Sequence, residues 1–248
     1  MRAVHRRTEA LRAAIAEREQ PRLLLSDENI LGETRPPSLA QGARLYPQAD
    51  LRLSRLLEAL ELEQVTLALA LRNPLALLVS GWGHQHLAGY PVSFEAYVAD
   101  VVPEELRWSE LVARLLGVKG VQKVLLWRYE DYPALLSEIT LILTGVKHGA
   151  IDGPRALPLA GPSARALEAV GQMQARRPGV SYKRALRRAM RDYPRGCDWP
   201  APQPFSPEAS AEGQARYAHD WACLCKMARV QCLTPLDGAS VSPARKPT

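Results

Sequence analysis

Residues 65–82 read VTLALALRNPLALLVSGW, and this stretch sets the first unit of the predicted fold. The apolar run 64–71 is typical of a strand buried on both faces. Arg72 and Asn73 end the run, and Pro74 fits the first turn of a helix, where a missing N–H group costs nothing. The stretch therefore predicts a strand, a tight turn and a helix that continues through 75–79.

Two further apolar runs have the same character, RLLLS at 22–26 and VQKVLLW at 121–127. Apolar residues at helical spacing indicate helices around these strands. We expect them at 2–19, 50–60, 94–100, 107–116 and 133–144. Apolar strands separated by helices predict an α/β fold with three layers, in which helices flank a central parallel sheet.

Polar clusters follow the three predicted strands. They are Ser-Asp-Glu at 26–28, Arg-Asn-Pro at 72–74 and Arg-Tyr-Glu-Asp at 128–131. Ligands of parallel sheets bind beyond the carboxyl ends of the strands. We therefore expect the three clusters to converge on one rim.

The chain after Gly145 has a different texture. Residues 165–177 and 182–192 predict basic helices, and a last helix is expected from Pro207 or Glu208 to about Arg229. Small residues and prolines at 234–248 predict a disordered tail. We interpret 1–233 as a single domain.

The balance of charge points to anionic partners. The 248 residues contain 32 Lys and Arg against 26 Asp and Glu, a net charge of +6 with a pI near 9.3. No lysine precedes Lys119. The first twenty residues are charged throughout, so we expect neither a signal peptide nor a membrane span, and a cytoplasmic protein.

Four cysteines lie in the last quarter of the chain, Cys197, Cys223, Cys225 and Cys232. Without a secretion signal we expect free thiols. Cys223 and Cys225 on one helix would face different sides, so the spacing does not favour a metal site, and we expect none.

Residues 65–82 resemble the region of 3′-phosphoadenylyl sulfate-dependent sulfotransferases that binds the 3′-phosphate of the donor. The shared features are a strand ending in Arg, an Asn-Pro turn and a Ser eight residues after the Arg. LLLSDENI at 23–30 resembles the Ser-x-Glu strand end of bacterial sulfotransferase-like proteins. KVLLWRYEDYP at 123–133 resembles the superfamily's strand followed by Tyr-Glu-Asp, and EGQARYAHDWACL at 212–224 resembles its closing helix.

The resemblance implies a P-loop-like sulfotransferase fold that transfers a sulfuryl group from 3′-phosphoadenylyl sulfate to a hydroxyl acceptor. It implies that Arg72 and Ser80 bind the 3′-phosphate and that Tyr129 contacts the nucleotide. Glu28 is the candidate general base for the acceptor hydroxyl. The acceptor is expected against the variable segments 33–48, 81–93 and 149–162.

Structural roles compete with each of these assignments. Arg72 can instead pair with Glu130 or Asp131, and Ser80 can bond the preceding helical turn. For Glu130 and Asp131 we favour ion pairing with an arginine or capping of the next helix, and Tyr129 can equally be buried. Glu28 can serve as a cap or in an ion pair. His84 and His86 can reach the acceptor, but we expect them in a solvated, glycine-rich loop.

One element of the family pattern is not found. A first strand followed by a lysine-containing loop that binds the 5′-phosphosulfate is expected before residue 22, where only the helix at 2–19 is predicted. We therefore expect a sheet without its first strand. The chain would then be truncated at its start or have a misassigned start. In one alternative the protein is inactive as encoded.

Two alternatives to a sulfotransferase stay open. A non-catalytic nucleotide-binding remnant or partner subunit would pair its exposed sheet edge with another chain, and a homo-oligomer is one such outcome. Less favoured is nucleic-acid binding by the nine Arg and Lys residues of the stretch 165–195, which contains ARRPGVSYKRALRRAMRDYPR at 175–195. Here we prefer a solvated basic helix, or arginines that face the nucleotide donor.

Overall fold

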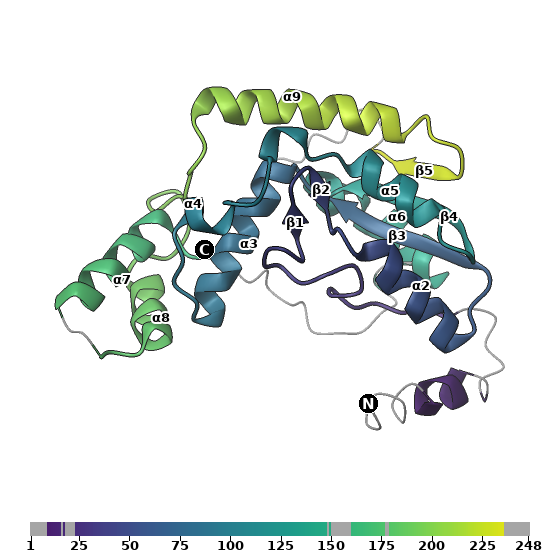
Figure 1. Cartoon of the computed structure of the whole chain (residues 1–248), viewed down its shortest axis with the longest axis horizontal. Coiled ribbons are helices and arrows are strands. Elements are labelled where there is room, and N and C mark those ends of the chain that lie inside the picture. Colours follow the sequence, from purple (N-terminus) through teal and green to yellow (C-terminus); the bar gives the residue numbers. More distant parts are fainter. Residues whose placement is uncertain are drawn as a thin grey trace.

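The computed structural model describes residues 9–15, 17, 23–147, 149, 160–176 and 179–235. Three parallel strands form its main sheet in the order β3 (Val65–Leu71), β4 (Val121–Arg128) and β5 (Val230–Leu233) (Figure 1). In the described part of the chain β3 pairs only with β4, so its other edge carries no strand. The expected α/β fold with a central parallel sheet is confirmed.

Helices make up most of the remaining ordered structure. Residues 9–15 are helical. The named helices are α2 (Ala49–Leu60), α3 (Pro74–Ala88), α4 (Phe94–Tyr97), α5 (Trp108–Leu116), α6 (Tyr132–Thr144), α7 (Ala164–Arg176), α8 (Tyr182–Asp192) and α9 (Pro207–Leu224). Single 3-10 turns lie at Pro103–Glu105 (η1) and Tyr129–Asp131 (η2), and β1 (Ala40–Gln41) pairs with β2 (Arg44–Leu45) as a small antiparallel hairpin.

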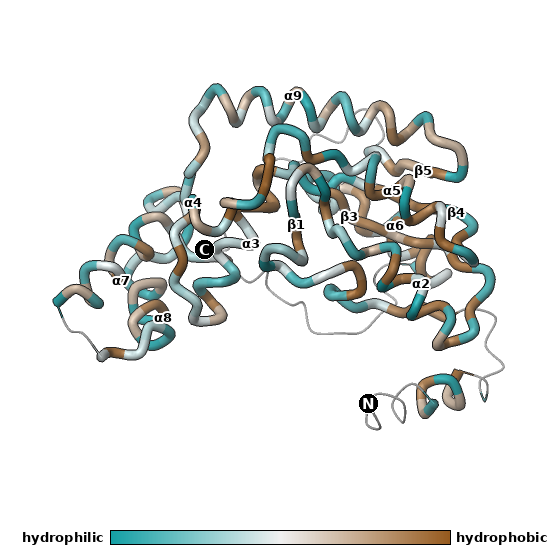
Figure 2. The backbone as a smooth tube through the Cα atoms, viewed as in Figure 1, coloured by the Kyte–Doolittle hydropathy of each residue, from teal (hydrophilic) through white to brown (hydrophobic). Residues whose placement is uncertain are grey.

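The sheet has helices on both faces. On one face Leu125 and Trp127 of β4 pack against Leu135 and Ile139 of α6. On the other face the alternate β4 residues join the main core, to which α2, α5 and α9 contribute. Figure 2 shows hydrophobic residues along β3, β4 and α6, whereas hydrophobic and hydrophilic residues alternate along α9. A separate small cluster joins α7 to α8, with Leu87 of α3 packed against it.

The predicted strand at 22–26 is wrong. Residues 23–27 have no regular secondary structure, and Leu23 and Leu24 are 47% and 51% exposed. The third strand is β5. Its four residues, VQCL, are too short an apolar run to predict a strand from the sequence. The apolar run at 22–26 predicted a strand that has no pairing partner among the described residues. β5 forms instead because its four residues pair with β4.

Several helix boundaries also differ from expectation. The helix after Pro74 runs to Ala88, so His84 and His86 lie on α3 and not in a solvated loop. The last helix ends at Leu224 and does not continue to Arg229, because the chain turns there to enter β5. The helix expected at 94–100 is only α4. Residues 2–8 and 236–248, parts of the predicted first helix and tail, lie outside the described residues.

The expectation of four free thiols is wrong as well. Cys225 and Cys232 form a disulfide with their Cα atoms 5.5 Å apart, whereas Cys197 and Cys223 are free and exposed. Cys225 follows the end of α9 and Cys232 lies on β5, so the reversal of the chain between them brings the two thiols together.

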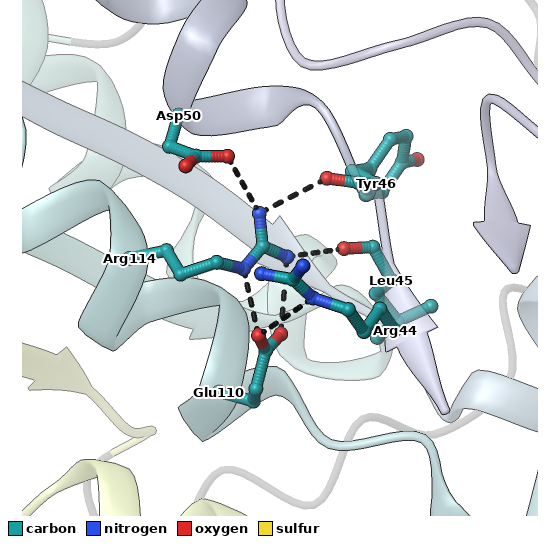
Figure 3. A network of polar contacts seen from close by, with 6 residues as sticks. All are labelled: Arg44, Leu45, Tyr46, Asp50, Glu110 and Arg114. Carbon is teal, nitrogen blue, oxygen red and sulfur yellow. Dashed lines mark hydrogen bonds and ion pairs between the residues drawn. The ribbon is translucent and has the colours of Figure 1, made fainter. Parts of the chain in front are cut away.

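A largely buried arginine, Arg114, joins α2, α5 and the β1–β2 hairpin (Figure 3). The Arg114 side chain is 12% exposed and donates to both carboxylate oxygens of Glu110, one turn earlier on α5. It also donates to Asp50 of α2 and to the backbone carbonyls of Leu45 and Tyr46. Five hydrogen bonds thus satisfy a guanidinium whose burial would otherwise be costly.

Candidate functional site

The turn between β3 and α3 is fixed by groups from distant elements. Tyr217 of α9 donates its hydroxyl to the carbonyl of Leu71 at 2.9 Å, and Trp108 of α5 donates its indole N–H to the carbonyl of Arg72 at 2.7 Å. Burial raises the pKa of Tyr217 far above its usual range, and the nearby Glu130 carboxylate adds to this, so the phenol stays a donor. The backbone that presents the Arg72 side chain is therefore held from two sides.

Asn73 starts α3 and ties it to α9. Its side-chain carbonyl accepts from the N–H groups of Leu75 and Ala76, at 2.9 and 3.3 Å, which caps the helix. Its amide donates to Gln214 Oε1 at 2.9 Å. Gly213 permits this close approach of the two helices, because a Cβ there would lie 2.4 Å from Leu75 Cδ1.

A cavity of about 1080 Å³ opens beside this turn. All four predicted site residues line it, Glu28, Arg72, Ser80 and Tyr129. Its walls come from the β3–α3 turn and from α3 as far as Leu87, from η2, from the start of α9, and from residues within 160–162 and 195–205. The cavity therefore lies at the carboxyl end of β3, where ligands of parallel sheets bind.

Arg72 carries a positive charge that the described residues do not neutralise. Its guanidinium carbon lies 5.0 Å from the centre of the Tyr129 ring, and none of the ion pairs within the described ranges includes it. Asp131, an alternative partner, is paired with Arg128 at 2.8 Å, as we favoured for this carboxylate. Glu130 instead accepts from the Tyr217 hydroxyl at 3.4 Å. Tyr129 is 50% exposed, so the reading of a buried tyrosine is wrong.

Ser80 and Glu28 line the cavity from different elements. Ser80 is exposed on α3, about 9 Å along the helix axis from Pro74. Glu28 reaches the cavity from a loop turn and not from a strand end. Asp27 supports that turn, because its carboxylate accepts from the N–H of Asn29 at 2.7 Å.

Arg195 and Gln214 are among the cavity residues that sequence reasoning missed. Arg195 follows α8, and its Nη1 would lie 3.4 Å from a Cβ at Gly161, so it adds a second guanidinium from a different wall. Its signal was present in the basic stretch 175–195, but nothing in the composition separates this arginine from those on α8. No lysine is among the described residues that line the cavity.

The two histidines of α3 have different surroundings. His84 is exposed and lines the cavity. His86 is 7% exposed, contacts the Tyr182 hydroxyl through Nδ1, and places Nε2 3.1 Å from the carbonyl of Val92. Burial lowers the pKa of His86, partly offset by that carbonyl, and raises the pKa of Tyr182 to about 12. His86 therefore joins α3 to α8 and does not face the cavity residues.

The acceptor segments proposed from sequence reach the same cavity in part. Thr34 and Leu39 come from the first segment, Gly83 and His84 from the second, and 160–162 from the third. Residues 150–159 lie outside the described residues. Among the described residues no cluster of three or more His, Cys, Asp or Glu side chains has the arrangement of a metal site. Nor does any described helix combine the length and apolar character needed to cross a bilayer.

Comparison of this chain with protein-family models, with curated proteins and with solved structures found no match.

Proposed function

We propose that this cavity binds a phosphorylated adenine nucleotide, and that the chain is a sulfotransferase-like protein using 3′-phosphoadenylyl sulfate as donor. A planar guanidinium suits the bidentate binding of a phosphate. Arg72 would bind the 3′-phosphate with the Ser80 hydroxyl as a further donor, and the exposed Tyr129 ring would contact the nucleotide. We also propose that the sheet has the P-loop-like topology of sulfotransferases.

One observation carries the proposal. Arg72 projects from an immobilised strand end into a cavity of about 1080 Å³ and has no ion-pair partner among the described residues. A structural arginine would be expected to pair with the neighbouring carboxylates, yet Asp131 is occupied by Arg128 and Glu130 contacts Tyr217. An unpaired, pre-positioned guanidinium in a large cavity favours an anionic ligand.

The proposed chemistry is sulfuryl transfer. The acceptor oxygen forms a bond to sulfur while the bond between sulfur and the bridging phosphate oxygen breaks, and the donor leaves as adenosine 3′,5′-bisphosphate. Glu28 would accept the proton of the acceptor hydroxyl. Stabilisation of the leaving group needs positive charge near the 5′ end, and Arg195 is the second guanidinium of the cavity.

Titration calorimetry with adenosine 3′,5′-bisphosphate tests the binding step. We expect binding by the unmutated chain and loss of about 2 kcal/mol or more for Arg72→Ala, because a charged hydrogen-bonding partner is removed. Arg55→Ala is the matched control, since Arg55 is exposed on α2 and outside the cavity. Equal binding by both variants would contradict the proposal.

A second assay tests the chemistry separately. Transfer of labelled sulfate from 3′-phosphoadenylyl sulfate to a panel of hydroxyl compounds should occur with the unmutated chain and fall by roughly a hundredfold or more in Glu28→Gln. Glu63→Gln controls for the loss of an exposed carboxylate outside the cavity and outside the expected acceptor segments. Nucleotide binding without transfer would support a non-catalytic nucleotide-binding protein.

A further inference from the structure

The outer side of α8 carries a row of arginines that the proposed function does not use. We call Arg184, Arg187, Arg188 and Arg191 the α8 basic face; all four are exposed. The opposite side of the helix is buried against α7 and α3 through Ala185, Leu186 and Ala189. The α8 arginines thus point away from the protein, so the expectation that they face the donor is not met on this helix.

The charge of this face is largely uncompensated. Arg188 lies 3.8 Å from Asp192, the one carboxylate of α8, and none of the other three has an ion pair among the described residues. Residues spaced by three, four and seven positions fall on one side of a helix, so the row extends about 10 Å. Like charges at this spacing repel and weaken the helix. A bound polyanion would relieve that repulsion.

The orientation of α8 brings its end toward the cavity. Tyr182, at the start of α8, contacts His86 near the end of α3. At the other end of α8, the carbonyl of Tyr193 accepts from Ser163, which follows the cavity-lining residue Pro162. Arg195 lies four positions beyond Arg191 and lines the cavity itself. The basic face and the cavity are therefore successive along the same stretch of chain.

We propose that the α8 basic face binds a linear anionic polysaccharide, which supplies the hydroxyl acceptor to the cavity. The choice of this occupant rests on the proposed function, because sulfuryl transfer needs a hydroxyl group close to the donor. Charge complementarity argues for a chain of regularly spaced carboxylates or sulfates. Single-stranded nucleic acids are bound with exposed aromatic rings that stack on the bases, and the α8 basic face has none.

Titration calorimetry of the full chain with a heparin octasaccharide at low salt tests the proposal. We expect binding that weakens steeply as salt rises. In the variant Arg184→Gln, Arg187→Gln, Arg191→Gln binding should weaken by about tenfold or more, because three of the charges that meet the ligand are lost. Glutamine has a helix propensity close to that of arginine, so α8 should persist, which circular dichroism checks.

A control variant separates the α8 basic face from net charge. Arg55→Gln, Lys119→Gln, Lys123→Gln removes the same charge from exposed positions outside this face, and its octasaccharide affinity should stay within about threefold of the unmutated chain. Equal weakening in both variants, or no binding at low salt by the unmutated chain, would overturn the proposal. Tighter binding of a DNA duplex of equal charge would overturn it in favour of nucleic acid.

Nucleotide titration of the same proteins keeps the two proposals apart. Adenosine 3′,5′-bisphosphate should bind the α8 variant as it binds the unmutated chain, because Arg72 and Ser80 are unchanged. Octasaccharide binding without nucleotide binding would leave the basic face supported and contradict the proposed function. Nucleotide binding without octasaccharide binding would do the reverse.

Discussion

Arg72 is positioned through its backbone. The carbonyls on either side of its Cα accept hydrogen bonds from Tyr217 and Trp108, and Asn73 caps the helix that follows. Its side chain touches only the face of Tyr129 among the aromatic rings described. A site assembled in this way presents a charge at a fixed place while the charge itself stays available to a ligand.

Asp220 has a structural role at the start of α5. It is 4% exposed on α9 and accepts from the N–H groups of Trp108 and Ser109, at 2.7 and 3.3 Å, and from the Ser109 hydroxyl. These are the first residues of α5, whose own preceding residue, Arg107, makes no side-chain cap. A carboxylate from another helix therefore caps α5.

Asp220→Ala should lower the free energy of unfolding by about 2 kcal/mol or more, because buried N–H donors lose their partner. Urea denaturation measures the change. Asp198→Ala, at an exposed position, is the control and should alter stability by less than about 0.5 kcal/mol. A similar small effect in both variants would show that the α5 cap is not needed.

At the scale of elements, α3 and α8 are joined by one buried histidine. A carbonyl can only accept, so the Nε2 of His86 carries the proton that meets Val92, and Nδ1 is free to accept from Tyr182. Protonation at Nδ1 would remove this acceptor. The lowered pKa of His86 therefore agrees with the geometry.

This contact predicts a pH dependence of stability. Because burial lowers the pKa of His86 in the folded state, the unfolded chain binds the proton more tightly, and stability is lost as pH falls below the unfolded value of about 6.5. Urea denaturation between about pH 8 and pH 5 should show a decline that is smaller in His86→Gln. His84→Gln, at an exposed position of α3, is the control. Identical pH profiles of His86→Gln and the unmutated chain would contradict this account.

The disulfide makes a second prediction about elements, because it fastens β5 to the end of α9. The denatured chain without reductant should expose two titratable thiols, those of Cys197 and Cys223, and all four after reduction. Cys225→Ser should cost about 2 kcal/mol of stability, from the loop entropy of the unfolded chain. Cys197→Ser should cost little, and four free thiols before reduction would refute the assignment.

Over the whole molecule, long elements were predicted well and short ones poorly. Apolar runs of seven or more residues predict the strands β3 and β4. Helical spacing over two or more turns predicts the helices α2, α5, α6 and α8. The strand predicted at 22–26 does not form and β5 is not predicted, since an apolar run such as 23–25 becomes a strand only where a neighbour offers hydrogen bonds. The disulfide is not predicted either, because the pairing of Cys225 with Cys232 depends on where α9 ends and β5 begins.

The candidate site was predictable to the extent that it sits on long elements. Arg72, Ser80 and Tyr129 follow β3 or β4 directly or lie on α3, and all line the cavity. Glu28 lines it too, although the strand expected to carry it is absent among residues 23–27. Arg195 was missed because its place depends on how the segment after α8 folds back beside Gly161, which is a tertiary contact without local signal.

The central claim is that Arg72 is held ready for the 3′-phosphate of a nucleotide. A crystal structure of the chain with adenosine 3′,5′-bisphosphate measures this most directly. We predict the 3′-phosphate within hydrogen-bonding distance of the Arg72 guanidinium and the Ser80 hydroxyl, at about 2.7 to 3.2 Å. A nucleotide bound elsewhere, or bound in the cavity with its phosphates away from Arg72, would contradict the claim.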